Sequence, residues 1–185
     1  MSPFYLTLLA AFVAGFGARD QVTVAALSAR QRGHWPLLLL AAVSSVATAV
    51  FAGWASAWFL DVLAAPARLF MASMALLLAG LECIVIRPRA RMEEPTQSLG
   101  AATLVIVASQ LTDAARFLVF GTAIATAQPV PAVIGGAVAG LLLIGMAWAG
   151  SELIVSERTR AIRRVAGAVL LVVAVFVGLR AANLV

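Results

Sequence analysis

The chain has 185 residues, of which 63% are hydrophobic and only 11% are charged. Ordinary soluble domains are about 45–50% apolar and about a quarter charged, so one small soluble core cannot bury this much apolar surface. We therefore predict an all-α, polytopic membrane protein. All 13 basic residues are arginines. Most of them stand in short clusters between apolar runs, which argues against a nucleic-acid binder, because such a protein needs a soluble basic surface.

Six apolar runs are long enough, or nearly so, to cross the roughly 30 Å hydrocarbon core of a bilayer as helices. They cover residues 4–28, 36–60, 68–86, 100–126, 131–153 and 163–183. Pro36 and Pro131 fall at predicted helix starts, where the missing N–H costs little. Helices are expected because every backbone polar group in lipid has to be satisfied within its own segment.

Arginines gather in alternate loops of this layout. Nine follow the first, third and fifth runs, against two on the opposite side, Arg68 and Arg180. The nine are Arg30, Arg32, Arg87, Arg89, Arg91, Arg158, Arg160, Arg163 and Arg164. The positive-inside rule then predicts that both termini lie outside the cytoplasm.

A weak internal repeat supports the same layout. A shift of 95 residues places Pro36 on Pro131 and Arg68 on Arg163. A unit of three helices is odd, so the second copy must enter the membrane from the opposite face, as in many transporters. We predict one membrane domain with two inverted three-helix repeats, residues 1–90 and 100–185, joined by a cytoplasmic linker at 91–99.

Two polar islands interrupt the apolar runs, GFGARDQ at residues 15–21 and QLTDAAR at 110–116, and the 95-residue shift superposes them. Charges in hydrocarbon cost several kcal/mol unless they are partnered. We expect cross-repeat pairs, Arg19 with Asp113 or Asp20 with Arg116. Such pairs either fix helix packing or line a substrate path, and the second interpretation is preferred. The predicted path residues are Arg19, Asp20, Gln21, Gln110, Thr112, Asp113 and Arg116.

Three other features have simpler interpretations. Glu82 stands near the end of the third run, close to Arg87, and is predicted to form an interfacial pair. Cys83 is the single cysteine, which excludes an internal disulfide, and we expect it to be a small apolar filler. The run GGAVAG at 135–140 predicts close helix packing.

The layout and the flanks of both islands resemble the Golgi-type calcium/manganese–proton exchanger family, which has many bacterial members and is related to the LysE-type transporters. That family carries the motif Glu-x-Gly-Asp-Lys/Arg-Thr/Ser, usually followed by Gln, in the first helix of each of two inverted three-helix repeats. Here Gly17, Arg19 and Gln21 match in the first copy, and Asp113 alone matches in the second. The resemblance implies an integral protein of the bacterial inner membrane.

The resemblance also implies a substrate. The full motif would gather four carboxylates and two basic groups, which suits a hard divalent cation. Mn²⁺ or Ca²⁺ would then be the transported substrate rather than a cofactor, with Asp113, Asp20 and Gln110 as ligands. In this chain two aspartates stand against two arginines, Arg19 and Arg116, whose positive charges oppose a bound cation.

Three hypotheses follow. The chain is a divalent-cation/proton exchanger, or a divergent relative that carries an anionic or zwitterionic solute recognised by Arg19 and Arg116, or a membrane interaction protein that no longer transports. The expected partners are the lipid bilayer and a small ion or solute, and a homo-oligomer is left open. An enzyme is not expected, because the sequence shows no Ser/His pair and no His-rich metal motif.

Overall fold

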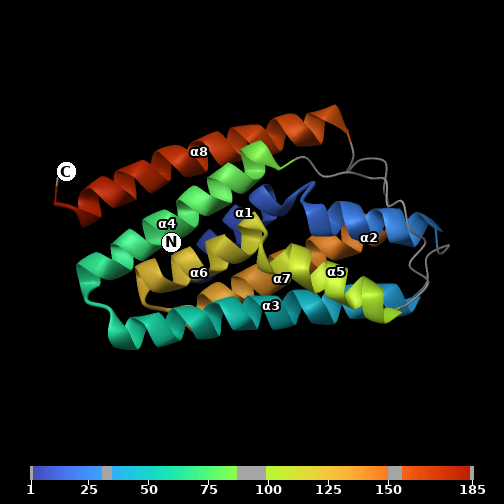
Figure 1. The fold of residues 1–185 in the computed structure, drawn as a ribbon, viewed down its shortest axis with the longest axis horizontal. Helices are drawn as coiled ribbons and strands as arrows, with labels where there is room; N and C mark the ends of the chain where they lie inside the picture. The colour runs from blue at the N-terminus through green and yellow to red at the C-terminus, as the bar shows by residue number, and fades with distance from the viewer. Residues whose placement is uncertain (1, 31–34, 87–98, 150–155, 184–185) are drawn as a thin grey trace.

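The computed structural model describes residues 2–30, 35–86, 99–149 and 156–183, and all the regular secondary structure in these ranges is helical. The helices, shown in Figure 1, are α1 (Pro3–Gly15), α2 (Arg19–Arg30), α3 (Trp35–Val62), α4 (Ala65–Val85), α5 (Leu99–Leu111), α6 (Ala114–Thr126), α7 (Pro129–Ala149) and α8 (Glu157–Ala181). The prediction of an all-helical protein is therefore confirmed for the described part of the chain.

Four of these helices, α3, α4, α7 and α8, are each long and apolar enough to cross a membrane. The other four form two bent pairs, α1 with α2 at 60° and α5 with α6 at 48°. The number of candidate spans is six if each bent pair counts as one span. The predicted runs 4–28 and 100–126 are thus not continuous helices, because each is interrupted beside its polar island.

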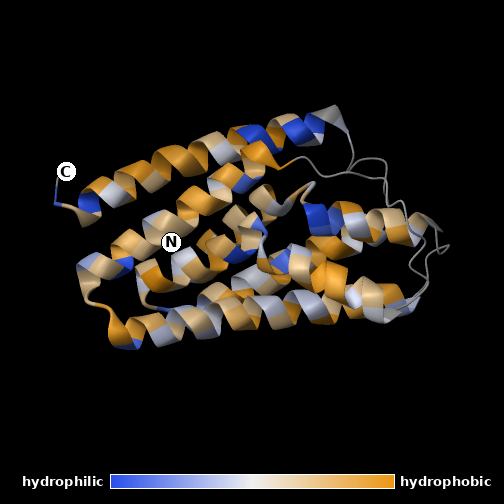
Figure 2. Cartoon of the chain, in the orientation of Figure 1, coloured by the Kyte–Doolittle hydropathy of each residue, from blue (hydrophilic) through white to orange (hydrophobic). Residues whose placement is uncertain are grey.

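The outer and interior surfaces have the composition expected of a protein in hydrocarbon. Large side chains lie on the outside, where Val43 is 67% exposed, Leu104 74% and Val172 71%. The interior is rich in alanine, glycine, serine and threonine, and Thr7 and Thr122 share a buried 2.7 Å hydrogen bond there. In Figure 2 apolar colours run along most of the helical ribbons. Small residues inside and large apolar ones outside are typical of membrane bundles, so the long apolar helices are consistent with a membrane protein.

Close helix approach explains the glycines. A Cβ at Gly80 of α4 would lie 2.9 Å from the carbonyl oxygen of Gly167 in α8. In α7 a Cβ at Gly135 would collide with the carbonyl oxygen of Phe4 in α1. Gly136 and Gly140, farther along the same run, pack against side chains of α6 and α3. The prediction that GGAVAG serves helix packing is therefore confirmed.

The two halves of the chain interlock. Helix α1 packs along α7, α3 packs against α7, and α4 packs along α8, as Figure 1 shows for α4 and α8. Helices α2 and α6 begin at Arg19 and Ala114, which are 95 residues apart, the offset found in the sequence. The breaks that precede them therefore fall at equivalent positions. Of the predicted linker at 91–99, residues 91–98 lie outside the described residues.

Candidate functional site

The first break separates α1 from α2. Helix α1 ends at Gly15, and Gly17 follows with a φ of 76°, a left-handed conformation that glycine adopts without strain. The side-chain oxygen of Gln21 accepts a hydrogen bond from the backbone N–H of Gly17. The Gln21 amide nitrogen also donates to the carbonyl oxygen of Leu143 in α7, at 2.9 Å. Gln21 thus ties the break to the neighbouring helix.

The second break separates α5 from α6. Asp113 has extended backbone angles and caps α6, where its Oδ2 accepts a 3.4 Å hydrogen bond from the N–H of Ala115. A carboxylate is favoured at this position because the start of a helix carries a partial positive charge. The capping geometry explains why a charged residue interrupts the helix at this point.

The two breaks are in direct contact. The guanidinium of Arg19, at the start of α2, donates to both oxygens of Thr112, at 2.8 Å to Oγ1 and 3.2 Å to the carbonyl oxygen. Its Nε lies 3.7 Å from Oε1 of Glu82 in α4. Arg19 therefore joins both breaks to a third helix.

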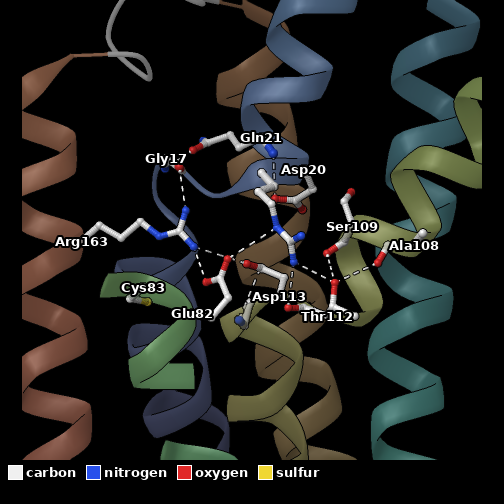
Figure 3. A network of polar contacts seen from close by, with 12 residues as sticks. Gly17, Asp20, Gln21, Glu82, Cys83, Ala108, Ser109, Thr112, Asp113 and Arg163 are labelled. Carbon is white, nitrogen blue, oxygen red and sulfur yellow. Dashed lines mark hydrogen bonds and ion pairs between the residues drawn. The ribbon is translucent and has the colours of Figure 1, made fainter. Parts of the chain in front are cut away.

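A second arginine completes this cluster from α8. Arg163 forms a buried ion pair with Glu82, donates a 2.8 Å hydrogen bond to the carbonyl oxygen of Gly17, and lies 3.9 Å from Oδ1 of Asp113 (Figure 3). The exposed fractions of Arg163, Glu82 and Asp113 are 3%, 5% and 2%. The cluster thus links α4, α6 and α8 to the first helix break.

Two residues have surroundings that differ from those expected from the sequence. Glu82 is buried and pairs with Arg163; its predicted partner, Arg87, lies outside the described residues. Arg163 is not a loop charge, because its guanidinium is buried in the cluster while Arg158 and Arg164 on the same helix are exposed. Of the other predicted loop arginines, Arg32, Arg87, Arg89 and Arg91 lie outside the described residues.

The predicted cross-repeat ion pairs are also corrected. Within the described ranges, Arg19 has its carboxylate contact with Glu82 rather than Asp113. Arg116 donates from Nε to Thr48 Oγ1 at 2.8 Å and from Nη2 to Ser45 Oγ at 2.8 Å, both in α3. The reason is the break itself, since the change of direction at each island turns the charged side chains toward other helices.

The remaining predicted residues lie around the same cluster. Asp20 is 8% exposed, and its Oδ1 accepts a 2.7 Å hydrogen bond from the N–H of Gln21. Gln110 is fully buried, and its Oε1 lies 3.4 Å from the hydroxyl of Thr48. Asp20 and Asp113 both interact electrostatically with Arg116. All seven predicted residues therefore lie at or beside the two breaks.

The charged cluster around the breaks is electrically balanced, but its polar atoms are not all hydrogen-bonded to protein groups. Its three carboxylates belong to Asp20, Glu82 and Asp113, and its three guanidinium groups belong to Arg19, Arg116 and Arg163. Five buried polar atoms around the breaks have no hydrogen bond to a protein group within the described part of the chain. They are Arg19 Nε, Glu82 Oε1, Gln110 Nε2, Asp113 Oδ1 and Arg163 Nε. Buried polar groups in proteins are nearly always satisfied, so a group of unsatisfied ones requires an explanation. No set of three or more His, Cys, Asp or Glu side chains positioned to hold a metal occurs among the described residues.

Sequence reasoning missed Glu82 and Arg163 as members of this site. Two observations pointed to them: an acidic residue within an apolar run is a functional candidate by default, and Arg163 falls on Arg68 under the 95-residue shift. Arg68 has a different role, because it donates to the carbonyl oxygens of Leu60, in the last turn of α3, and of Leu63, just after that helix.

Comparisons with models of protein families, with curated proteins and with solved structures find no significant match for this chain. The class of protein therefore follows from the helices and the cluster alone. It is an all-helical protein, consistent with insertion in a membrane, with a buried charged cluster at two helix breaks.

Proposed function

We propose that the chain is a secondary transporter and that a small solute passes through the contact between the two helix breaks. One observation carries this proposal: both polar islands interrupt their helices at equivalent positions, and Arg19 of one break binds Thr112 of the other. Broken helices whose ends meet near the middle of a bundle are a recurring way to build a transport site. The two three-helix halves are proposed to be inverted repeats, with both termini outside the cytoplasm of a bacterial inner membrane.

The five unsatisfied polar atoms support a path rather than a purely structural ion-pair network. A network selected only for stability would satisfy its members, because an orphaned buried polar group costs about 1–3 kcal/mol. No group among the described residues forms a hydrogen bond with these atoms, although guanidinium and carboxylate groups lie within 4 Å. A solute or water passing through the breaks would supply the missing partners.

The first candidate cargo is a divalent cation, Mn²⁺ or Ca²⁺, exchanged for protons, as the family resemblance implies. Asp113 and Asp20 would be its charged ligands and Gln110 a neutral one. The Oδ1 atom of Asp113 is buried without a hydrogen bond and would be free to bind. Before a cation can bind, Arg163 has to move away from Asp113, which lies 3.9 Å from it.

Flux through purified protein tests this proposal. We would measure Mn²⁺ and Ca²⁺ uptake into proteoliposomes under an imposed pH gradient, for the unmodified chain, for Asp113→Asn, and for the control Asp61→Asn on the exposed end of α3. We expect uptake to fall at least about tenfold in Asp113→Asn, since a charged ligand interaction is worth roughly 1.5–3 kcal/mol, and to persist in the control.

A second cargo, an anionic or zwitterionic solute, is favoured by the accessibility of the charges. The side chain of Arg19 is 33% exposed, whereas the side chains of Glu82 and Asp113 are 4% and 2% exposed. A solute approaching this conformation therefore meets a guanidinium before it meets a carboxylate. Uptake of labelled glycine and acetate, with Arg19→Gln beside the exposed control Arg164→Gln, tests this cargo.

The two assays separate the three hypotheses. Cation uptake that depends on Asp113 supports the exchanger. Uptake of glycine or acetate that depends on Arg19 supports the altered cargo. A well-folded protein that moves none of these solutes would contradict the transporter proposal and leave a membrane interaction protein, whose partner would then be sought by cross-linking in the native membrane.

A further inference from the structure

A cavity of about 270 Å³ lies between α3, α4 and α6, and Leu111 at the end of α5 also lines it. Its polar end is formed by Thr48 and Arg116, and neither Arg19 nor Asp113 lines it. The rest of the wall is apolar and includes Phe51, Met71, Met74, Leu78, Phe117 and Phe120. The volume is near the lower end of pockets that hold small organic ligands, roughly 300 Å³.

The guanidinium of Arg116 is built into this cavity rather than left at a surface. The residue is only 4% exposed, and α3 holds its Nε and Nη2 through Thr48 and Ser45. All of these partners are neutral, namely the two hydroxyls and the carbonyl oxygen of Ser45. Within the described ranges no carboxylate lies within 4.0 Å of the guanidinium. Asp20 and Asp113 act on it only from greater distances. A buried cation without a contacting counter-ion favours an anionic ligand.

The mouth of the cavity selects what can reach Arg116. It opens on the lipid-facing side of the bundle, where Phe51 is 53% exposed, Met74 42% and Leu78 43%. A hydrophilic ion would have to cross hydrocarbon to enter there. A mainly apolar molecule with one acidic group has no such barrier in its neutral form. Phenylalanine and methionine side chains on the wall pack well against an aromatic or alkyl body.

We propose that this cavity binds a small amphipathic organic acid as its anion, with the carboxylate on Arg116 and the apolar body between α4 and α6. Two equivalent carboxylate oxygens suit a guanidinium held in a fixed orientation. Arg116 belongs both to the cluster at the breaks and to the wall of this cavity, whereas Arg19 and Asp113 do not line the cavity. The proposal concerns binding alone and does not require that a solute passes between the breaks.

Benzoate is the probe, and benzamide is its neutral counterpart of nearly the same shape. We would measure saturable binding of both labelled compounds to purified protein in nanodiscs. The variants are Arg116→Gln, which removes the charge, and Ala55→Phe, which fills the cavity without touching Arg116. Val50→Phe, on an exposed part of α3 away from the cavity, is the matched control.

The expected result is saturable benzoate binding that weakens roughly tenfold or more in Arg116→Gln and in Ala55→Phe and is unchanged in Val50→Phe, with no saturable binding of benzamide. If Arg116→Gln does not fold, Ala55→Phe decides. Equal binding of benzoate and benzamide would show an apolar groove for lipid chains only and would overturn the proposal. The absence of saturable benzoate binding to the folded, unmodified protein would overturn it as well.

Discussion

Arg163→Met is the sharpest test of how the cluster is held together. The substitution keeps a long, flexible side chain at the start of α8 but removes the guanidinium. Glu82 then loses its buried ion pair, Gly17 loses a 2.8 Å hydrogen bond to its carbonyl oxygen, and Asp113 loses the positive charge that lies 3.9 Å away. Three carboxylates would remain against two guanidinium groups in the cluster.

The magnitude follows from burial and distance. At 3.9 Å and an effective dielectric constant of about 20, one pair of opposite charges interacts by roughly 4 kcal/mol before desolvation is counted. Removing one partner of a buried pair generally costs about 3–5 kcal/mol, because the other charge stays buried. We therefore expect Arg163→Met to lower the free energy of unfolding by about 3–5 kcal/mol. Arg164→Met on the exposed face should change it by less than about 0.5 kcal/mol.

A double-mutant cycle separates the ion pair from general packing. Unfolding would be followed by intrinsic tryptophan fluorescence in detergent, for Arg163→Met, for Glu82→Gln and for the double variant. The double variant removes both charges and should recover at least about 1 kcal/mol relative to the sum of the single effects. Additive single effects, or a loss below about 1 kcal/mol in Arg163→Met, would refute the assignment of a buried, mutually dependent pair.

Three further predictions follow from backbone geometry and burial. Gly80→Val should lower the unfolding temperature strongly, because its Cβ would lie 2.9 Å from the Gly167 oxygen. The control Gly145→Val should be tolerated, because a Cβ there meets nothing within 4 Å. Equal effects of the two substitutions would contradict the packing of α4 against α8. Gly17→Ala should cost about 1–2 kcal/mol in an unfolding titration, since its φ of 76° strains other residues; a stabilised variant would contradict the strained break. Cys83, 3% exposed and packed near the Ala14 carbonyl, should react with a maleimide only after unfolding. Rapid labelling of the folded protein would show that α4 and α1 separate.

The all-helical class and the approximate position of each apolar segment could be predicted from the amino-acid sequence alone. Hydropathy is a local property, since a run of about 20 apolar residues is enough to span a bilayer whatever lies elsewhere in the chain. The same local contrast marked the islands at 15–21 and 110–116, and every predicted path residue lies at or beside a break. The packing role of GGAVAG was predictable because glycine in an apolar helix indicates close approach.

Which charges pair with one another could not be predicted and became known from the packing of the helices. The choice depends on how each helix is rotated and where it bends, and these are set by contacts between segments far apart in the chain. A 60° bend after Gly15 and a 48° bend before Asp113 turn Arg19 toward Glu82 and leave Asp113 facing Arg163. Arg163 was predicted to be a loop charge because the sequence does not show which face of α8 packs against α4. Packing places that side chain in the interior, where a guanidinium is stable only with its partners, which are Gly17 of the first break, Glu82 of α4 and Asp113, the cap of α6.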